Sequence, residues 1–108
     1  MLLSINEIRD KITPVAQKYD LRAVYLFGSY ARNEADENSD IDLLVDRTDS
    51  KIKSMFDMGG LYEELQTCLE KSIDVVTTHT LEQESTKERT PYFIENINAE
   101  RVLIYEQG

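Results

Sequence analysis

Apolar residues near the start of the chain recur every three or four positions, the period of one face of a helix. The residues of this stripe are Ile5, Ile8, Ile12 and Val15. Ser4 precedes the stripe and Glu7 follows three residues later, which is the spacing of a capping box at a helix N-terminus. Pro14 lies inside the pattern, where it removes one backbone hydrogen bond. The pattern therefore predicts a first helix that Pro14 kinks or interrupts.

Short apolar and β-branched runs between polar segments predict strands. These runs are Ala23–Phe27, Asp40–Asp46, Ser72–Thr77 and, as an edge strand, Arg101–Tyr105. A helical pattern from about Phe56 to Lys71 separates the second run from the third. A weaker polar helix is expected over Leu81–Glu88, and Thr90-Pro91 predicts the start of a short helix that reaches about Asn96. The order of elements indicates an α+β or α/β domain with a small mixed β-sheet flanked by helices, and we interpret residues 1–108 as a single domain.

Composition narrows the class of protein further. Hydrophobic residues make up 41% and charged residues 31% of the chain, and the formal net charge is −9. This acidic balance argues against direct nucleic-acid binding and against docking on an anionic membrane. Neither a membrane-spanning run nor a signal peptide is recognisable, and Cys68 alone cannot form an internal disulfide. We expect a cytoplasmic protein.

The stretch with the clearest chemistry is Gly28-Ser29, ten further residues, and then Asp40-Ile41-Asp42. Residues two apart on a strand share a face, so both aspartates point the same way with Cα atoms ~6.6 Å apart. At an effective dielectric constant of 20, two such charges repel by roughly 2.5 kcal/mol. A hard cation relieves that repulsion, and carboxylate oxygens are ligands that suit Mg²⁺.

The Gly-Ser pair supplies the other half of a nucleotide site. A strand that ends in Gly28-Ser29 and turns into a helix presents backbone N–H groups and a hydroxyl to an anion. Arg32, one turn later, is placed to add charge-assisted hydrogen bonds to phosphates. Asp74 lies in the third predicted strand. If that strand neighbours the Asp40–Asp42 strand, Asp74 can help hold a metal and accept a proton from an attacking hydroxyl.

With these residues in place, the sequence resembles the minimal nucleotidyltransferases of the DNA polymerase β superfamily. The resemblance covers most of the chain: the first helix, the Tyr-Leu-Phe-Gly-Ser strand end, the Ser-Asp-Ile-Asp-Leu-Leu-Val strand, the third acidic strand and the Pro-Tyr-Phe-Ile-Glu segment. It implies a polymerase-β-like nucleotidyltransferase fold and an enzyme that transfers a nucleoside monophosphate from an NTP to a hydroxyl, releasing pyrophosphate.

The same resemblance assigns the site. Gly28, Ser29 and Arg32 would bind the triphosphate, with ATP as the expected substrate. Asp40, Asp42 and Asp74 would be the catalytic carboxylates and the ligands of two Mg²⁺ ions. Small members of the family resemble antitoxins paired with a HEPN-type ribonuclease toxin, so the acceptor hydroxyl is expected on such a partner protein, in a homo- or hetero-oligomeric assembly.

Other interpretations remain open on the sequence alone. Asp40 and Asp42 also fit a solvated strand face of an acidic protein. The cluster Met55, Phe56 and Met58 fits either the core or a partner surface. An antitoxin that acts by contact alone, or a domain that senses a nucleotide without transferring it, is the alternative to an adenylyltransferase.

Overall fold

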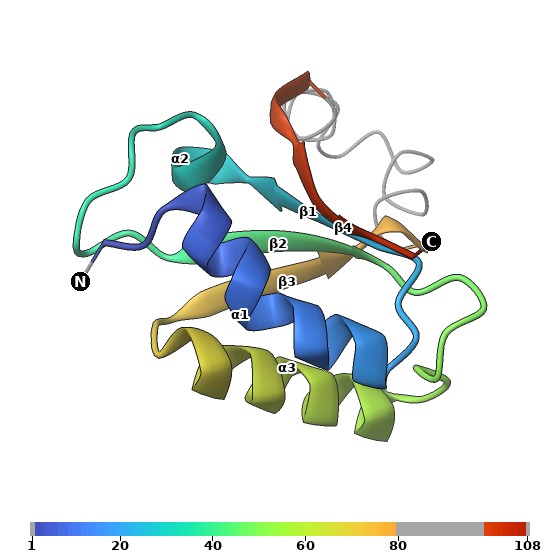
Figure 1. The fold of residues 1–108 in the computed structure, drawn as a ribbon. Coiled ribbons are helices and arrows are strands. Elements are labelled where there is room, and N and C mark those ends of the chain that lie inside the picture. The colour runs from blue at the N-terminus through green and yellow to red at the C-terminus, as the bar shows by residue number, and fades with distance from the viewer. Residues whose placement is uncertain (1, 80–98, 108) are drawn as a thin grey trace, which may run out of the picture.

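The computed structural model describes residues 2–79 and 99–107 of the chain (Figure 1). Three helices and four strands follow one another along these residues. In chain order they are α1 (Ile5–Lys18), β1 (Ala23–Phe27), α2 (Gly28–Ala31), β2 (Ile41–Asp46), α3 (Met55–Leu69), β3 (Ile73–Thr77) and β4 (Val102–Glu106). The helices predicted over Leu81–Glu88 and from Pro91 lie outside the described residues.

The four strands form one mixed sheet in the order β3-β2-β1-β4. β1 pairs antiparallel with both β2 and β4, whereas β2 and β3 run parallel. The parallel pair needs a crossover connection, and α3 supplies it. The α+β class and the small mixed sheet are therefore confirmed, and β4 is the edge strand that the sequence predicts.

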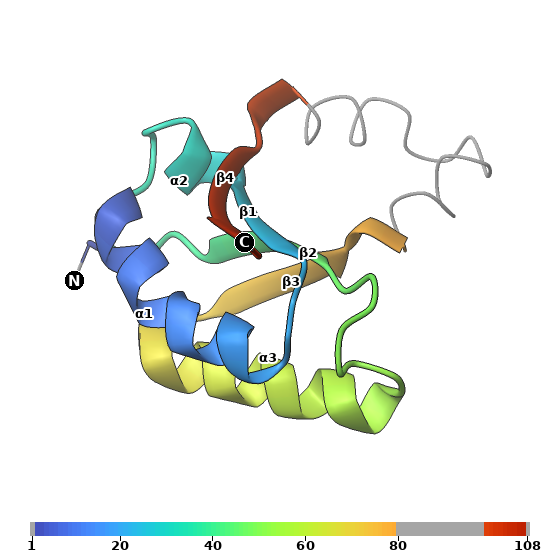
Figure 2. The same ribbon diagram turned by 45° about the vertical axis from the view of Figure 1, so that its right-hand side comes forward.

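Helices α1 and α3 lie side by side across one face of the sheet (Figures 1 and 2). The main core lies between them and that face. Its helical residues include Ile8, Ile12, Ala16, Leu61, Leu65 and Leu69, and its strand residues include Val24, Leu26, Ile41, Leu43, Val45 and Ile73. Alternate strand residues point to the opposite face, where Phe27 and Leu44 form a second, smaller cluster.

Helix α1 begins as the capping box predicts. The Glu7 backbone N–H donates to the Ser4 hydroxyl, and the Ser4 backbone N–H donates to the Glu7 carboxylate. The helix then continues to Lys18 without a break at Pro14, so the expectation of an interruption there is wrong. Pro14 is on the exposed side of the helix, while buried side chains both before and after it pack on the sheet. Burial of Ile8 and of Ile12 contributes about 1.5–3 kcal/mol each, which together offsets the ~3 kcal/mol cost of an interior proline.

Helix α3 divides the Met55, Phe56 and Met58 cluster. Met58 packs against the main core, whereas Met55 is 86% and Phe56 89% exposed. Core packing therefore accounts for one of the three residues only.

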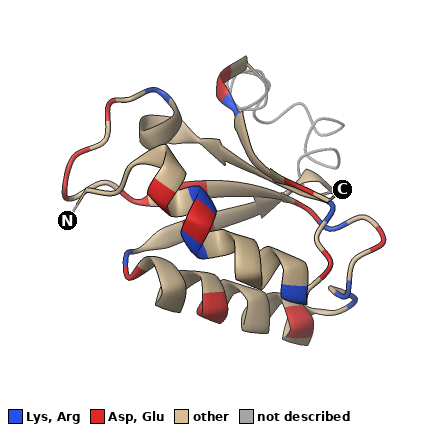
Figure 3. Cartoon of the chain, in the orientation of Figure 1, with Lys and Arg blue, Asp and Glu red and all other residues tan. Residues whose placement is uncertain are grey.

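Most charged residues lie on the helices and the connecting loops, and most residues of the sheet are uncharged (Figure 3). Among residues 2–79 and 99–107, no helix has the length and apolarity that crossing a bilayer requires.

Candidate active site

The turn from β1 into α2 brings the backbone against a carboxylate. Gly28 has a φ of +72°, in the left-handed region that favours glycine. A Cβ built on Gly28 would lie 3.1 Å from Cγ of Asp42 and would overlap its Oδ2 atom. Glycine is thus required here both by the backbone angle and by the close approach of Asp42.

Asp42 and Asp74 lie opposite each other on neighbouring strands. In the parallel pairing of β2 with β3, Asp42 is in register with Asp74. Asp74 lies close enough to the Asp42 side chain for a hydrogen bond that helps to raise the pKa of Asp42. The strand adjacency that the sequence left conditional is therefore present, and it brings these two predicted site residues into contact.

The surroundings of Asp42 favour its protonated form. Burial, the nearby charges of Asp74 and Asp40, and the hydrogen bond to Asp74 raise the pKa of Asp42 to about 6, while the charge of Arg32 opposes the rise. Desolvation is the largest of these causes. A carboxyl group whose pKa is raised toward neutral pH in this way is common at functional sites.

Asp40 lies just before the strand that carries Asp42. β2 begins at Ile41, one residue later than the sequence predicts, so Asp40 directly precedes the strand. Asp40 is exposed, and its negative charge contributes to the raised pKa of Asp42. The expected group of three is thus a contacting pair, Asp42 and Asp74, with Asp40 beside it.

The donor set fits a hard divalent cation. Both members of the pair offer carboxylate oxygens, which are the ligands that a hard divalent cation prefers. Among the described parts of the chain, no three Asp, Glu, His or Cys side chains converge closely enough to hold a metal ion as they stand. Full coordination by Asp40, Asp42 and Asp74 therefore remains a prediction.

Ser29 is half-buried in the turn that follows Gly28. The turn is closed by two backbone hydrogen bonds: the Arg32 N–H donates to the Gly28 carbonyl at 3.1 Å, and the Glu34 N–H donates to the Ser29 carbonyl at 2.9 Å. These bonds fix the backbone on which Gly28, Ser29 and Arg32 are carried. Their role in holding a triphosphate remains a prediction.

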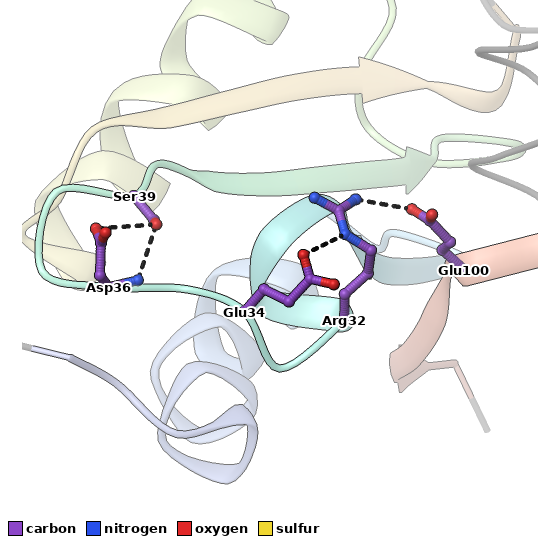
Figure 4. Close-up of polar contacts among 5 residues, drawn as sticks. All are labelled: Arg32, Glu34, Asp36, Ser39 and Glu100. Carbon is purple, nitrogen blue, oxygen red and sulfur yellow. Dashed lines mark hydrogen bonds and ion pairs between the residues drawn. The ribbon is translucent and has the colours of Figure 1, made fainter.

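Arg32 is engaged by two glutamates (Figure 4). Its Nε donates to Glu34 Oε2 at 3.3 Å and its Nη1 donates to Glu100 Oε2 at 3.0 Å. Both carboxylates, Glu100 first, raise the pKa of the Arg32 guanidinium above its ordinary value. The positive charge of Arg32 also opposes the rise in the pKa of Asp42, so Arg32 acts electrostatically on the carboxylate pair.

Glu34 and Glu100 contact the predicted site residue Arg32, and the sequence interpretation did not include either of them. Glu34 is two residues from Arg32, and this short spacing is a weak signal that was available. Glu100 is 68 residues from Arg32, so nothing local in the sequence indicates the contact. Only the pairing of β4 with β1 brings the two together.

The mixed sheet with paired aspartates on adjacent strands, next to a glycine turn, is the arrangement that the resemblance to nucleotidyltransferases implies. The family description "Polymerase beta, Nucleotidyltransferase" matches residues 10–108. The chain belongs to this family.

Relatives within the family are named as protein adenylyltransferases. A "Putative protein adenylyltransferase" of Methanocaldococcus jannaschii is 43% identical over 73% of this chain and 83% of its own length. The protein adenylyltransferase MntA of Thermococcus cleftensis is 33% identical over 74% of this chain and 83% of its own length.

A solved structure shares the fold. It is that of the tri-AMPylated Shewanella oneidensis HEPN toxin in complex with MNT antitoxin, in which one chain aligns with a TM-score of 0.61 and 18% identity. The alignment covers 95% of this chain and 73% of that chain.

Proposed function

We propose that this nucleotidyltransferase is a protein adenylyltransferase that transfers AMP from ATP to a hydroxyl group of a partner protein. The observation that carries the proposal is the Asp42–Asp74 pair in register on β2 and β3, directly beside Gly28. The adenylyl donor and the protein acceptor follow from the names of the relatives at 43% and 33% identity.

In the proposed reaction, the acceptor oxygen forms a bond to the α-phosphorus of ATP. The bond between the α-phosphorus and the bridging oxygen to the β-phosphate breaks, and pyrophosphate leaves. Asp74 is exposed on β3 and accepts the proton of the acceptor hydroxyl. Gly28 allows the triphosphate to approach the backbone, and the Ser29 hydroxyl donates to it.

The carboxylates have a second role as metal ligands. Asp40 and Asp42 would hold Mg²⁺ with Asp74 completing the set. When bound, Mg²⁺ supplies positive charge that stabilises the developing charge on the triphosphate.

The proposed acceptor is a HEPN-type toxin, and the chain would then act as its antitoxin. The support is the shared fold with a chain of the AMPylated toxin–antitoxin complex. The net charge of −9 also favours rapid association with a basic partner. That charge equally supports the second candidate, an antitoxin that neutralises by contact alone.

The test uses ATP radiolabelled in its α-phosphate, Mg²⁺, the purified chain and lysate of its source cells. A labelled protein band is expected with the wild type and is expected to be lost with Asp42→Asn, because the substitution removes a carboxylate of the pair. Asp10→Asn is the matched control, since Asp10 is an exposed aspartate on α1, on the other side of the sheet. Labelling that survives in Asp42→Asn contradicts the proposed site.

The two candidates separate in a second assay. Neutralisation of the toxin by the Asp42→Asn chain, with no label transferred by the wild type, favours contact alone. Loss of neutralisation together with loss of label favours adenylylation.

A further inference from the structure

The two contacts of Arg32 differ in strength. The Glu100 side chain is 29% exposed and lies 3.0 Å from Nη1, whereas the Glu34 side chain is 64% exposed and lies 3.3 Å from Nε. Exposed ion pairs contribute little, and shorter, more shielded ones contribute more. Glu100 is therefore the stronger of the two partners that fix the Arg32 guanidinium.

Glu100 is itself anchored to the sheet. β4 begins two residues later, and its Val102 pairs with Leu26 of β1. The intervening Arg101 guanidinium lies over the Tyr25 ring, 4.6 Å from its centroid. Glu34, in contrast, belongs to the same turn as Arg32 and adds no link to another element. The position of Arg32 thus depends on a strand that is distant in sequence.

The remaining donors of Arg32 are directed elsewhere. A guanidinium has five N–H donors in one plane, and the two glutamates use one on Nε and one on Nη1. Figure 4 shows the other terminal nitrogen pointing away from both glutamates. Arg32 lies on the turn beside the carboxylate pair: its backbone N–H donates to the Gly28 carbonyl at 3.1 Å, and Gly28 lies directly against Asp42.

We propose that Glu100 is a positioning residue for nucleotide binding: it holds Arg32 so that the unused guanidinium donors meet the triphosphate. This inference rests on the proposed function and extends it to a residue outside the Gly-Ser and Asp-x-Asp motifs. Because the two contacts leave donors unused, Arg32 binds a phosphate without releasing Glu100. Removal of Glu100 frees the side chain to move, and binding weakens because Arg32 must be ordered again when the nucleotide binds.

The experiment measures binding of AMP-PNP with Mg²⁺ by calorimetry, so that turnover does not interfere. We expect Arg32→Ala to weaken binding about tenfold, as for loss of a hydrogen bond to a charged group, and Glu100→Ala about fivefold. Glu100→Gln retains a carbonyl oxygen that accepts from Nη1, so its effect is expected to stay within about twofold. Glu106→Ala removes an exposed glutamate from the far end of the same strand and is the matched control.

The double variant Arg32→Ala/Glu100→Ala shows whether Glu100 acts through Arg32. If it does, the double variant binds as weakly as Arg32→Ala alone, since coupled residues are not additive. In the labelling assay, Glu100→Ala should raise the KM for ATP and leave kcat unchanged, a split that general destabilisation would not produce.

Three outcomes overturn the inference. Tighter binding by Glu100→Ala means that the glutamate competes with phosphate, and additive effects in the double variant mean that it acts independently of Arg32. Unchanged binding by Glu100→Ala, with wild-type binding intact, rejects the positioning role alone. A wild-type chain that binds no AMP-PNP rejects the proposed function itself.

Discussion

At the scale of single residues, the site depends on how closely the Gly28 backbone approaches the Asp42 carboxyl group. Gly28 combines a left-handed φ with a position where a methyl group would overlap Asp42 Oδ2. Gly59, at an exposed position in the first half of α3, has open space where a methyl group would lie, with no neighbouring atom within 4 Å. The structure therefore requires glycine at position 28, whereas position 59 has room for a larger residue.

Gly28→Ala is expected to destabilise the fold by about 2–4 kcal/mol, because backbone strain and overpacking act together. Gly59→Ala is expected to stabilise it by about 0.5–1 kcal/mol, the helix preference of alanine over glycine. Urea unfolding of both variants measures the difference. Similar stability changes for the two substitutions would contradict the close packing of Gly28 on Asp42.

The raised pKa of Asp42 predicts a specific pH dependence. Burial and the neighbouring aspartates raise the pKa of Asp42 to about 6 in the folded chain, against about 3.9 for an unperturbed aspartate. As pH rises from about 4 to 6, the unfolded chain loses this proton first, so the contribution of Asp42 to stability falls and stays low above that range.

Asp42→Asn should therefore be more stable than the wild type by roughly 1 kcal/mol at about pH 8, a figure reduced for the partial exposure of the group. The difference should vanish near pH 4, where the carboxyl group is protonated in both states. Unfolding curves at both pH values check this, with Asp10→Asn as the control. An advantage of Asp42→Asn that grows as pH falls would show that the pKa is lowered instead.

At the scale of elements, α1 shows how tertiary packing overrides a local signal. Pro14 has no N–H for the Asp10 carbonyl, yet α1 continues because Ile8, Ile12 and Ala16 are buried against the sheet. The Thr13 hydroxyl donates to the Arg9 carbonyl at 2.6 Å, one residue from the missing bond.

Pro14→Ala is expected to raise the free energy of unfolding by about 1–2 kcal/mol, less than the full helix penalty of proline because proline also restricts the unfolded chain. Thermal unfolding followed by circular dichroism is the measurement. Pro14 is exposed, so loss of packing does not mask the result. Lower stability of the variant would mean that restriction of the unfolded chain by proline outweighs its cost in the helix.

The elements also show which parts of the site are predictable from sequence. Alternation of polar and apolar residues predicts that Asp42 lies on the same strand face as Asp40. The Gly28-Ser29 pair predicts a turn that contributes to the same site. The Asp42–Asp74 contact requires β2 and β3 to be neighbours, and the local pattern cannot specify strand order. The Arg32–Glu100 contact spans 68 residues and depends on the register of β4, so sequence patterns contain no sign of it.

At the scale of the whole molecule, added salt is expected to stabilise this chain of net charge −9 in two different ways. Self-repulsion among the many acidic groups is screened by any electrolyte, since the Debye length falls to about 8 Å at physiological ionic strength. A cation that binds the carboxylate pair acts differently, because it stabilises the folded chain by binding to one site. Only the second effect requires Asp42.

Added NaCl is expected to raise the Tm of the wild type and of Asp42→Asn by the same amount. Replacing NaCl by MgCl₂ at equal ionic strength should raise the wild-type Tm further. At ten times the dissociation constant, site binding adds about 1.4 kcal/mol, or about 6 °C for a domain of this size. Asp42→Asn should lack this second increment, and EDTA should remove it from the wild type. An equal Mg²⁺ increment in both chains would place the cation on the acidic surface in general, because a delocalised ion atmosphere does not depend on one half-buried carboxylate.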